Sequence, residues 1–169
     1  GLEQRRRVRS VRVGPTPNYV GSSTEADEVA QIVRAIQLWT TGGIQHGEIA
    51  VFVSTNQRAD QCRHGLRTAG IPASDLGGRP DEAASAVTVT TLHRAKGLEF
   101  KAVVVAGASD QVIPSTRTLQ SQDEVGLGRE RDLLYVGLTR ARDHLVITWT
   151  GEPSRFLLDA ITAPVDADS

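Results

Sequence analysis

The stretch TTLHRAKGLEF, residues 90–100, gathers polar side chains where a buried strand is expected to end. Thr91 and His93 offer a hydroxyl and an imidazole there, and residues 95–100 are predicted to begin a helical turn with free amides. This combination suits a phosphate backbone, which it would position without reading its sequence. Glu99 could accept a hydrogen bond from a ribose hydroxyl. On residue types alone, a capping histidine and a solvated acid are the simpler interpretation of His93 and Glu99.

A second polar segment contains Arg140 and Arg142, near the end of a predicted helix over residues 129–143. An arginine held over a phosphate offsets charge in the transition state, which contributes roughly 10³ to 10⁵ in rate when it acts as a finger. The alternative is a salt-bridged helix end, since cations near a helix C-terminus are favourable in any case. Taken alone, this segment fits the alternative better.

Several kinds of site are missing from the sequence. Neither lysine, Lys96 or Lys101, stands in the G-x-x-x-x-G-K-[ST] pattern of a phosphate loop, and Asp110 has no adjacent acid with which to hold Mg²⁺. One cysteine, Cys62, and four scattered histidines show no metal-ligand spacing, so no metal site is expected. The chain is therefore not expected to bind and activate a nucleotide alone.

The composition indicates an ordinary globular α/β protein. Hydrophobic residues make up 39% of the 169 residues and charged residues 23%, while the net charge of -1 argues against a uniformly basic nucleic-acid binder. No apolar run approaches the ~20 residues that cross a bilayer, so we expect a cytoplasmic protein with no membrane partner.

Apolar periodicity predicts strands that alternate with helices. The predicted strands are residues 5–13, 48–54, 87–92, 102–107 and 144–150, and the predicted helices are residues 22–43, 56–70, 129–143 and 154–161. Residues 109–128 show no firm period and are expected to form a loop. The alternation implies a mostly parallel sheet covered by helices on both faces, with ligands bound beyond the carboxyl ends of the strands.

Together, VTVTTLHRAKGLEFKAVVVAG and ERDLLYVGLTRARDHLVIT closely resemble motifs V and VI of superfamily 1 helicases of the UvrD, Rep and PcrA family. The resemblance is strong over residues 87–150 and weaker over residues 5–78. It implies the second RecA-like domain of such a helicase, a three-layer α/β domain without a phosphate loop of its own. We expect that domain at residues 1–164, followed by a polar tail at 165–169.

The resemblance also implies roles for individual residues. Arg140 matches the arginine that reaches the γ-phosphate, and it forms the ATP-binding set with Glu99 and Gly97. The residues that match contacts to the single-stranded DNA backbone are Thr91, His93 and Lys96. Tyr135 is expected to pack beneath Arg140. ATP and Mg²⁺ are the implied cofactors of the full-length protein, and this chain alone is expected to bind neither tightly.

The sequence departs from the family pattern in three places. The first domain, with its phosphate loop and Mg²⁺ site, is missing, as is the Asn-Tyr-Arg segment expected just upstream of Gly1. The large helical insertion of the family is absent near residues 77–86. We therefore expect the motor half of an ATP-dependent DNA helicase or translocase, with single-stranded DNA and the first RecA-like domain as partners. The alternative is a helicase-derived interaction module of a factor that remodels a polymerase or another complex.

Overall fold

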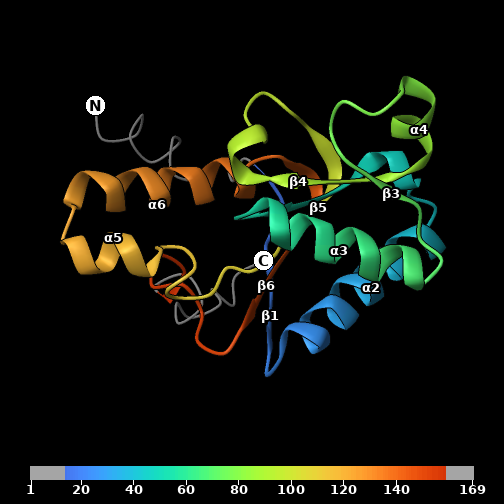
Figure 1. The fold of residues 1–169 in the computed structure, drawn as a ribbon. Helices are drawn as coiled ribbons and strands as arrows, with labels where there is room; N and C mark the ends of the chain where they lie inside the picture. The colour runs from blue at the N-terminus through green and yellow to red at the C-terminus, as the bar shows by residue number, and fades with distance from the viewer. Residues whose placement is uncertain (1–13, 159–169) are drawn as a thin grey trace, which may run out of the picture.

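The computed structural model describes residues 14–158, which form a single parallel sheet with helices on both faces (Figure 1). The strands are β1 (Asn18–Ser22), β2 (Ile49–Val53), β3 (Ala73–Ser74), β4 (Val87–Thr91), β5 (Phe100–Val105) and β6 (Ala141–Thr150). They lie in the order β1-β6-β5-β2-β4-β3, and each neighbouring pair is parallel. The predicted α/β class with a mostly parallel sheet is confirmed.

Five α-helices and two short 3₁₀ helices connect these strands within the described residues. The helices are α2 (Glu25–Thr41), α3 (Asn56–Thr68), α4 (Pro80–Ser85), α5 (Thr116–Ser121) and α6 (Glu124–Leu138), with 3₁₀ turns η1 (His46–Glu48) and η2 (Leu92–Arg94). The predicted strand at 5–13, the domain limit at 164, the polar tail and the end of the predicted helix 154–161 lie outside the described residues. Residues 155–157 form a turn.

The core has two halves, one on each face of the sheet. Because side chains alternate along a strand, Val51 of β2 faces one half and Phe52 the other. Val51 packs with α2 and α3 through residues such as Ile36 and Leu66, all fully buried. Phe52 packs beneath α6 with Leu134. Three layers result, and Figure 1 shows α2 and α3 together, away from α6.

The helices predicted at 22–43 and 56–70 are confirmed as α2 and α3. Thr24 caps α2 and accepts a hydrogen bond from the Asp27 amide at 3.1 Å, which satisfies one of the free N–H groups of the first turn. In α3, Cys62 and Leu66 face inward. Ala69 is exposed because α3 ends at Thr68 and Ala69 is its C-cap.

Three sequence predictions are wrong. Residues 109–128 are not a loop: they contain α5 and the start of α6, whose N-cap Asp123 accepts from the Gly126 amide at 3.0 Å. The helix predicted at 129–143 ends at Leu138, because Ala141 already pairs with β5 as the first residue of β6. Residues 95–100 do not begin a helical turn, since the 3₁₀ turn η2 comes earlier and Phe100 opens β5. The strand β1 was not predicted.

The single cysteine is expected to be unreactive in the folded chain. Cys62 is 2% exposed, and burial raises the pKa of its thiol to about 11. Only about one thiol in a thousand is then ionised at pH 8, and the thiolate is the reactive form. Iodoacetamide should therefore label Cys62 far more slowly in native protein than in denaturant, which mass spectrometry can follow. Equal labelling rates in the two conditions would contradict this placement.

Candidate functional site

The two predicted groups of site residues lie at opposite edges of the sheet. Thr91 is level with Val53, so it ends β4 at the carboxyl edge. Phe100 is level with Ala141, so Glu99 and Arg140, which precede them, lie at the amino edge of β5 and β6. Only residues 92–99 lie between Thr91 and Phe100 along the chain, so this short connection runs from the carboxyl edge to the amino edge, past β2. That connection is shorter than the roughly dozen residues usual between parallel strands.

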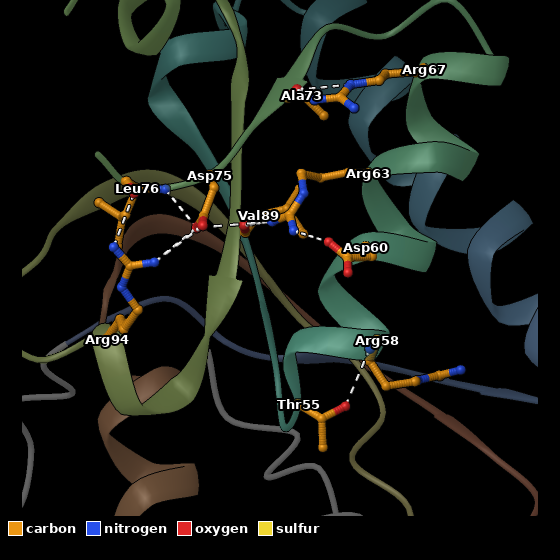
Figure 2. A network of polar contacts seen from close by, with 10 residues as sticks. All are labelled: Thr55, Arg58, Asp60, Arg63, Arg67, Ala73, Asp75, Leu76, Val89 and Arg94. Carbon is orange, nitrogen blue, oxygen red and sulfur yellow. Dashed lines mark hydrogen bonds and ion pairs between the residues drawn. The ribbon is translucent and has the colours of Figure 1, made fainter. Parts of the chain in front are cut away.

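The carboxyl-edge group consists of Thr91 and His93. Thr91 is buried, at 7% exposure, whereas His93 projects from η2 and is exposed. The next residue, Arg94, pairs with Asp75, and the two nearest atoms lie 3.1 Å apart. Arg94 Nη2 also donates to the Leu76 carbonyl at 2.9 Å (Figure 2). These contacts tie η2 to the segment that follows β3.

Arg63 of α3 completes this network at the edge of β4. The Val87 amide donates to the Pro72 carbonyl, so Val89, two residues on, also directs its backbone groups towards β3. Since β3 ends at Ser74, level with Thr88, no strand reaches the Val89 carbonyl. Arg63 Nη1 donates to that carbonyl at 2.7 Å and lies 3.9 Å from Asp75 (Figure 2).

The connecting segment 92–99 contains Lys96 and Gly97. Leu92 and Ala95 are buried against the α6 side of the sheet, while Lys96 and Gly97 form an exposed turn between them and β5. Gly97 has a φ of +79°, which favours glycine. The structure therefore leaves the Lys96 side chain accessible to solvent.

At the amino edge, Arg140 caps the C-terminus of α6. Its Nε donates to the Val136 carbonyl at 3.0 Å, its Nη2 to Thr139 Oγ1 at 3.0 Å and its Nη1 to the Leu98 carbonyl at 3.4 Å. The first of these bonds goes to a carbonyl in the last turn of α6, where intrahelical donors run out. Tyr135 is 51% exposed, and its packing beneath Arg140 stays a prediction.

Glu99 and Arg142 form an ion pair at the same edge. Arg142 Nε lies 3.5 Å from Glu99 Oε1, and both side chains are more than half exposed. The Phe100 amide donates to the Arg140 carbonyl at 3.0 Å, which holds the starts of β5 and β6 together. The structure thus brings Glu99, Arg140 and Arg142 together and keeps them apart from Thr91 and His93.

Gly137 lets α6 approach η2 closely. A Cβ at this position would lie 2.3 Å from Leu92 Cδ2, and Leu92 is 1% exposed with little room to move. We expect Gly137→Ala to lower the free energy of unfolding by about 1–2 kcal/mol, because overpacking outweighs the helix propensity that alanine adds. Gly128→Ala is the matched control: nothing lies within 4 Å of its Cβ, so thermal unfolding should show no loss. Equal effects of the two substitutions would contradict the close packing.

Glu28 is a buried acid that the sequence prediction missed. It is 0% exposed and accepts from the Gly107 amide at 2.8 Å, Arg58 Nη2 at 3.3 Å and Thr150 Oγ1 at 2.9 Å. These bonds join α2 and α3 to the carboxyl ends of β5 and β6. One signal was available: Glu28 stands four residues before Ile32, on the apolar stripe of the predicted helix.

A groove of about 470 Å³ lies away from all these residues. It runs between α2, β1 and β6, with Val20, Trp39 and Val146 among its lining, and it contains none of the predicted site residues. Within residues 14–158, no cluster of three or more His, Cys, Asp or Glu side chains could hold a metal ion. The same residues include no helix with the length and apolarity needed to cross a bilayer.

Comparison with known proteins identifies the part of the chain that carries both groups. Residues 74–152 match the model of the UvrD-like helicase C-terminal domain. They resemble that family. The match extends from the end of β3 past the end of β6, so it contains the whole of the connection 92–99 and both sheet edges.

Relatives of this UvrD-like domain are DNA helicases. DNA helicase II of Rickettsia typhi is 52% identical over 62 residues, which cover 37% of this chain and 9% of that protein. The ATP-dependent DNA helicase UvrD1 of Mycobacterium tuberculosis is 48% identical over 69 residues, which cover 41% of this chain and 9% of that protein. The chain thus matches about a tenth of the length of these curated relatives.

A solved structure shares the fold. The C-terminal domain of a "possible DNA helicase" from Lactobacillus plantarum superposes with a TM-score of 0.65 at 24% identity, over 85% of this chain and 80% of that one. The predicted α/β, RecA-like fold of the described residues is confirmed by this likeness, and the predicted UvrD-like resemblance is confirmed for residues 74–152. The roles of individual residues stay predictions.

Proposed function

We propose that this chain is the C-terminal motor domain of an ATP-dependent DNA helicase or translocase, which acts in the cytoplasm. It completes an ATP site whose phosphate loop and Mg²⁺ ligands belong to the first RecA-like domain, and it contacts single-stranded DNA at its other edge. The observation that carries the proposal is the connection 92–99, which links the Thr91 and His93 edge directly to the Glu99 and Arg140 edge.

At the nucleotide edge, Arg140 acts as the arginine finger and Glu99 receives the ribose. Arg140 already lies at the sheet edge, bonded to two backbone carbonyls and to Thr139. Exchange of these neutral acceptors for a charged γ-phosphate is favourable, because hydrogen bonds to ionised acceptors are roughly twice as strong. Gly97 gives the turn beside Glu99 its shape. ATP with Mg²⁺, when bound between the two domains, supplies the phosphoryl group that is transferred.

Three residues form the proposed DNA site: His93 and Lys96 contact the phosphate backbone, and Thr91 positions the turn that carries them. His93 and Lys96 are exposed, as contacts to a strand must be, whereas the buried Thr91 supports the turn from below. Such contacts fix register without reading bases. A movement of the DNA strand at this edge is transmitted to Glu99 and Arg140 by residues 92–99, which pack against α6.

Binding of labelled oligo(dT) to the chain, followed by fluorescence anisotropy at low salt, tests the DNA edge. We expect His93→Ala and Lys96→Ala each to weaken binding several-fold, because each removes a backbone contact and single-strand affinity depends strongly on such contacts. His46→Ala is the matched control, since His46 lies in η1 before β2, at the opposite edge. Equal affinities for all variants would contradict the proposed DNA edge.

The alternative function is an interaction module of a complex-remodelling factor. The short segment 77–86 favours this alternative. It contains only α4, and the large helical insertion that the family resemblance predicts there is absent. A stable protein partner on co-purification, with ATP hydrolysis indifferent to DNA, would support that alternative over the motor.

A further inference from the structure

Arg94 stands beside the proposed DNA contacts but belongs to none of the assigned positions. Its guanidinium makes a two-oxygen contact with Asp75, at 3.1 Å and 3.2 Å from Nη1, and Nη2 donates to the Leu76 carbonyl (Figure 2). Both side chains are about half exposed, 47% for Arg94 and 48% for Asp75. The pair is therefore reachable from solvent on the same turn as His93.

Asp75 has polar partners other than Arg94. Arg63 Nη1 lies 3.9 Å from Asp75 Oδ1, and the Leu76 amide donates to the same oxygen at 2.7 Å. Arg63 itself is held by the Val89 carbonyl and by Asp60, and its side chain is only 13% exposed. If Arg94 left, Asp75 would keep the Leu76 amide as a hydrogen-bond donor and Arg63 as a cation that it shares with Asp60.

An exposed ion pair of this kind contributes little to stability, because water screens it and two long side chains must be held still. A nucleic-acid phosphate offers Arg94 a matching two-oxygen acceptor and releases counterions from the strand. When Arg94 exchanges Asp75 for a phosphate, the protein therefore loses little stability and the binding free energy for DNA becomes more favourable.

We propose that Arg94 is a further contact to the phosphate backbone of single-stranded DNA, and that Asp75 binds the Arg94 guanidinium until the DNA displaces it. This inference rests on the proposed DNA edge at Thr91 and His93. Asp75 competes with the phosphate for the same guanidinium, so it limits affinity for any strand that does not displace it.

The competition predicts opposite effects for the two partners of one ion pair. Arg94→Ala should weaken binding of oligo(dT) by about threefold to tenfold and lower the slope of log affinity against log salt by about 0.7, the value for one single-strand phosphate contact. Asp75→Asn, which keeps the shape of the side chain and removes its charge, should tighten binding by about twofold to fivefold, since it frees Arg94 and removes a repulsive charge. Arg94→Lys should retain most of the affinity.

The same anisotropy titration in 50 mM salt measures every variant, with thermal unfolding to check the fold. The control is a second arginine–aspartate pair, Arg155 with Asp110, whose nearest atoms lie 2.9 Å apart and whose side chains are 46% and 24% exposed. Arg155→Ala and Asp110→Asn should leave DNA affinity unchanged, because this pair, although also at the carboxyl edge, follows β5 and β6, which β2 separates from β4.

Three results would overturn the inference. One is that Arg94→Ala and Asp75→Asn weaken binding together, as a purely structural clasp requires. Another is that neither substitution changes the affinity for oligo(dT). The third is that the wild-type chain does not bind oligo(dT), which would also contradict the proposed DNA edge. If His93→Ala has no effect while Arg94 and Asp75 variants diverge, the assigned contacts fail and the Arg94 contact stands.

Discussion

Replacing Arg140 by alanine is expected to lower the rate of ATP hydrolysis by about 10³, the lower end of what an arginine finger contributes. The measurement needs a longer protein in which this chain accompanies a phosphate-loop domain, with hydrolysis followed at saturating ATP and oligo(dT). The loss should appear in the turnover number rather than in ATP affinity, because the charge that Arg140 offsets develops in the transition state. Arg140→Lys should remain well below wild type, since an ammonium cannot reproduce the planar fork.

Arg142→Ala is the matched control for this prediction. Arg142 lies at the same edge, but its guanidinium is paired with Glu99 in an exposed contact 3.5 Å long. Its loss should change turnover far less than the loss of Arg140. Thermal unfolding must accompany both variants, because Arg140 also caps α6. Turnover close to wild type in Arg140→Ala would remove Arg140 from the catalytic role.

Replacing Glu28 by alanine is expected to reduce the free energy of unfolding by about 3 kcal/mol, the cost of breaking a buried ion pair. The substitution leaves the Gly107 amide without its acceptor, removes the nearer of the two acceptors of the Thr150 hydroxyl and removes the buried partner of Arg58. For a domain of this size the melting temperature should fall by roughly 10 °C. Differential scanning fluorimetry or chemical denaturation can measure the loss.

The neighbouring acid supplies the control for Glu28. Glu25 also pairs with Arg58, at 3.0 Å, but its side chain is 64% exposed. Glu25→Ala should therefore cost less than about 1 kcal/mol, as surface ion pairs usually do. Glu28→Gln should fall between the two, since an amide oxygen can still accept from Gly107. A Glu28→Ala protein as stable as Glu25→Ala would mean that the network contributes nothing.

The strands β2, β4, β5 and β6 and the helices α2 and α3 could be predicted because local signals and tertiary structure agree there. Runs such as IAVFV are apolar throughout, and β2 is indeed buried on both faces. The start of α6 could not be predicted from propensity, because Gly126 and Gly128 weaken a helix. The Asp123 cap and packing against the sheet form the helix despite them.

The position of the site residues was only partly predictable. Motif residues could be identified along the chain, but their distribution over two edges depends on β4 and β5 running in the same direction, each parallel to β2. The Glu28 network likewise joins residues 79 and 122 positions apart. Asp75 and Arg94 are 19 positions apart and meet only because β3 pairs with β4. No local pattern encodes these contacts.

The most direct test of the account measures ATP hydrolysis with and without single-stranded DNA. The phosphate-loop domain and this chain should each hydrolyse almost no ATP alone, and ATP hydrolysis should appear when they are combined in one protein. Oligo(dT) should then raise the rate severalfold, because DNA at the Thr91 and His93 edge acts through residues 92–99 on Arg140. A rate that is the same with and without oligo(dT) would contradict the coupling of the two edges.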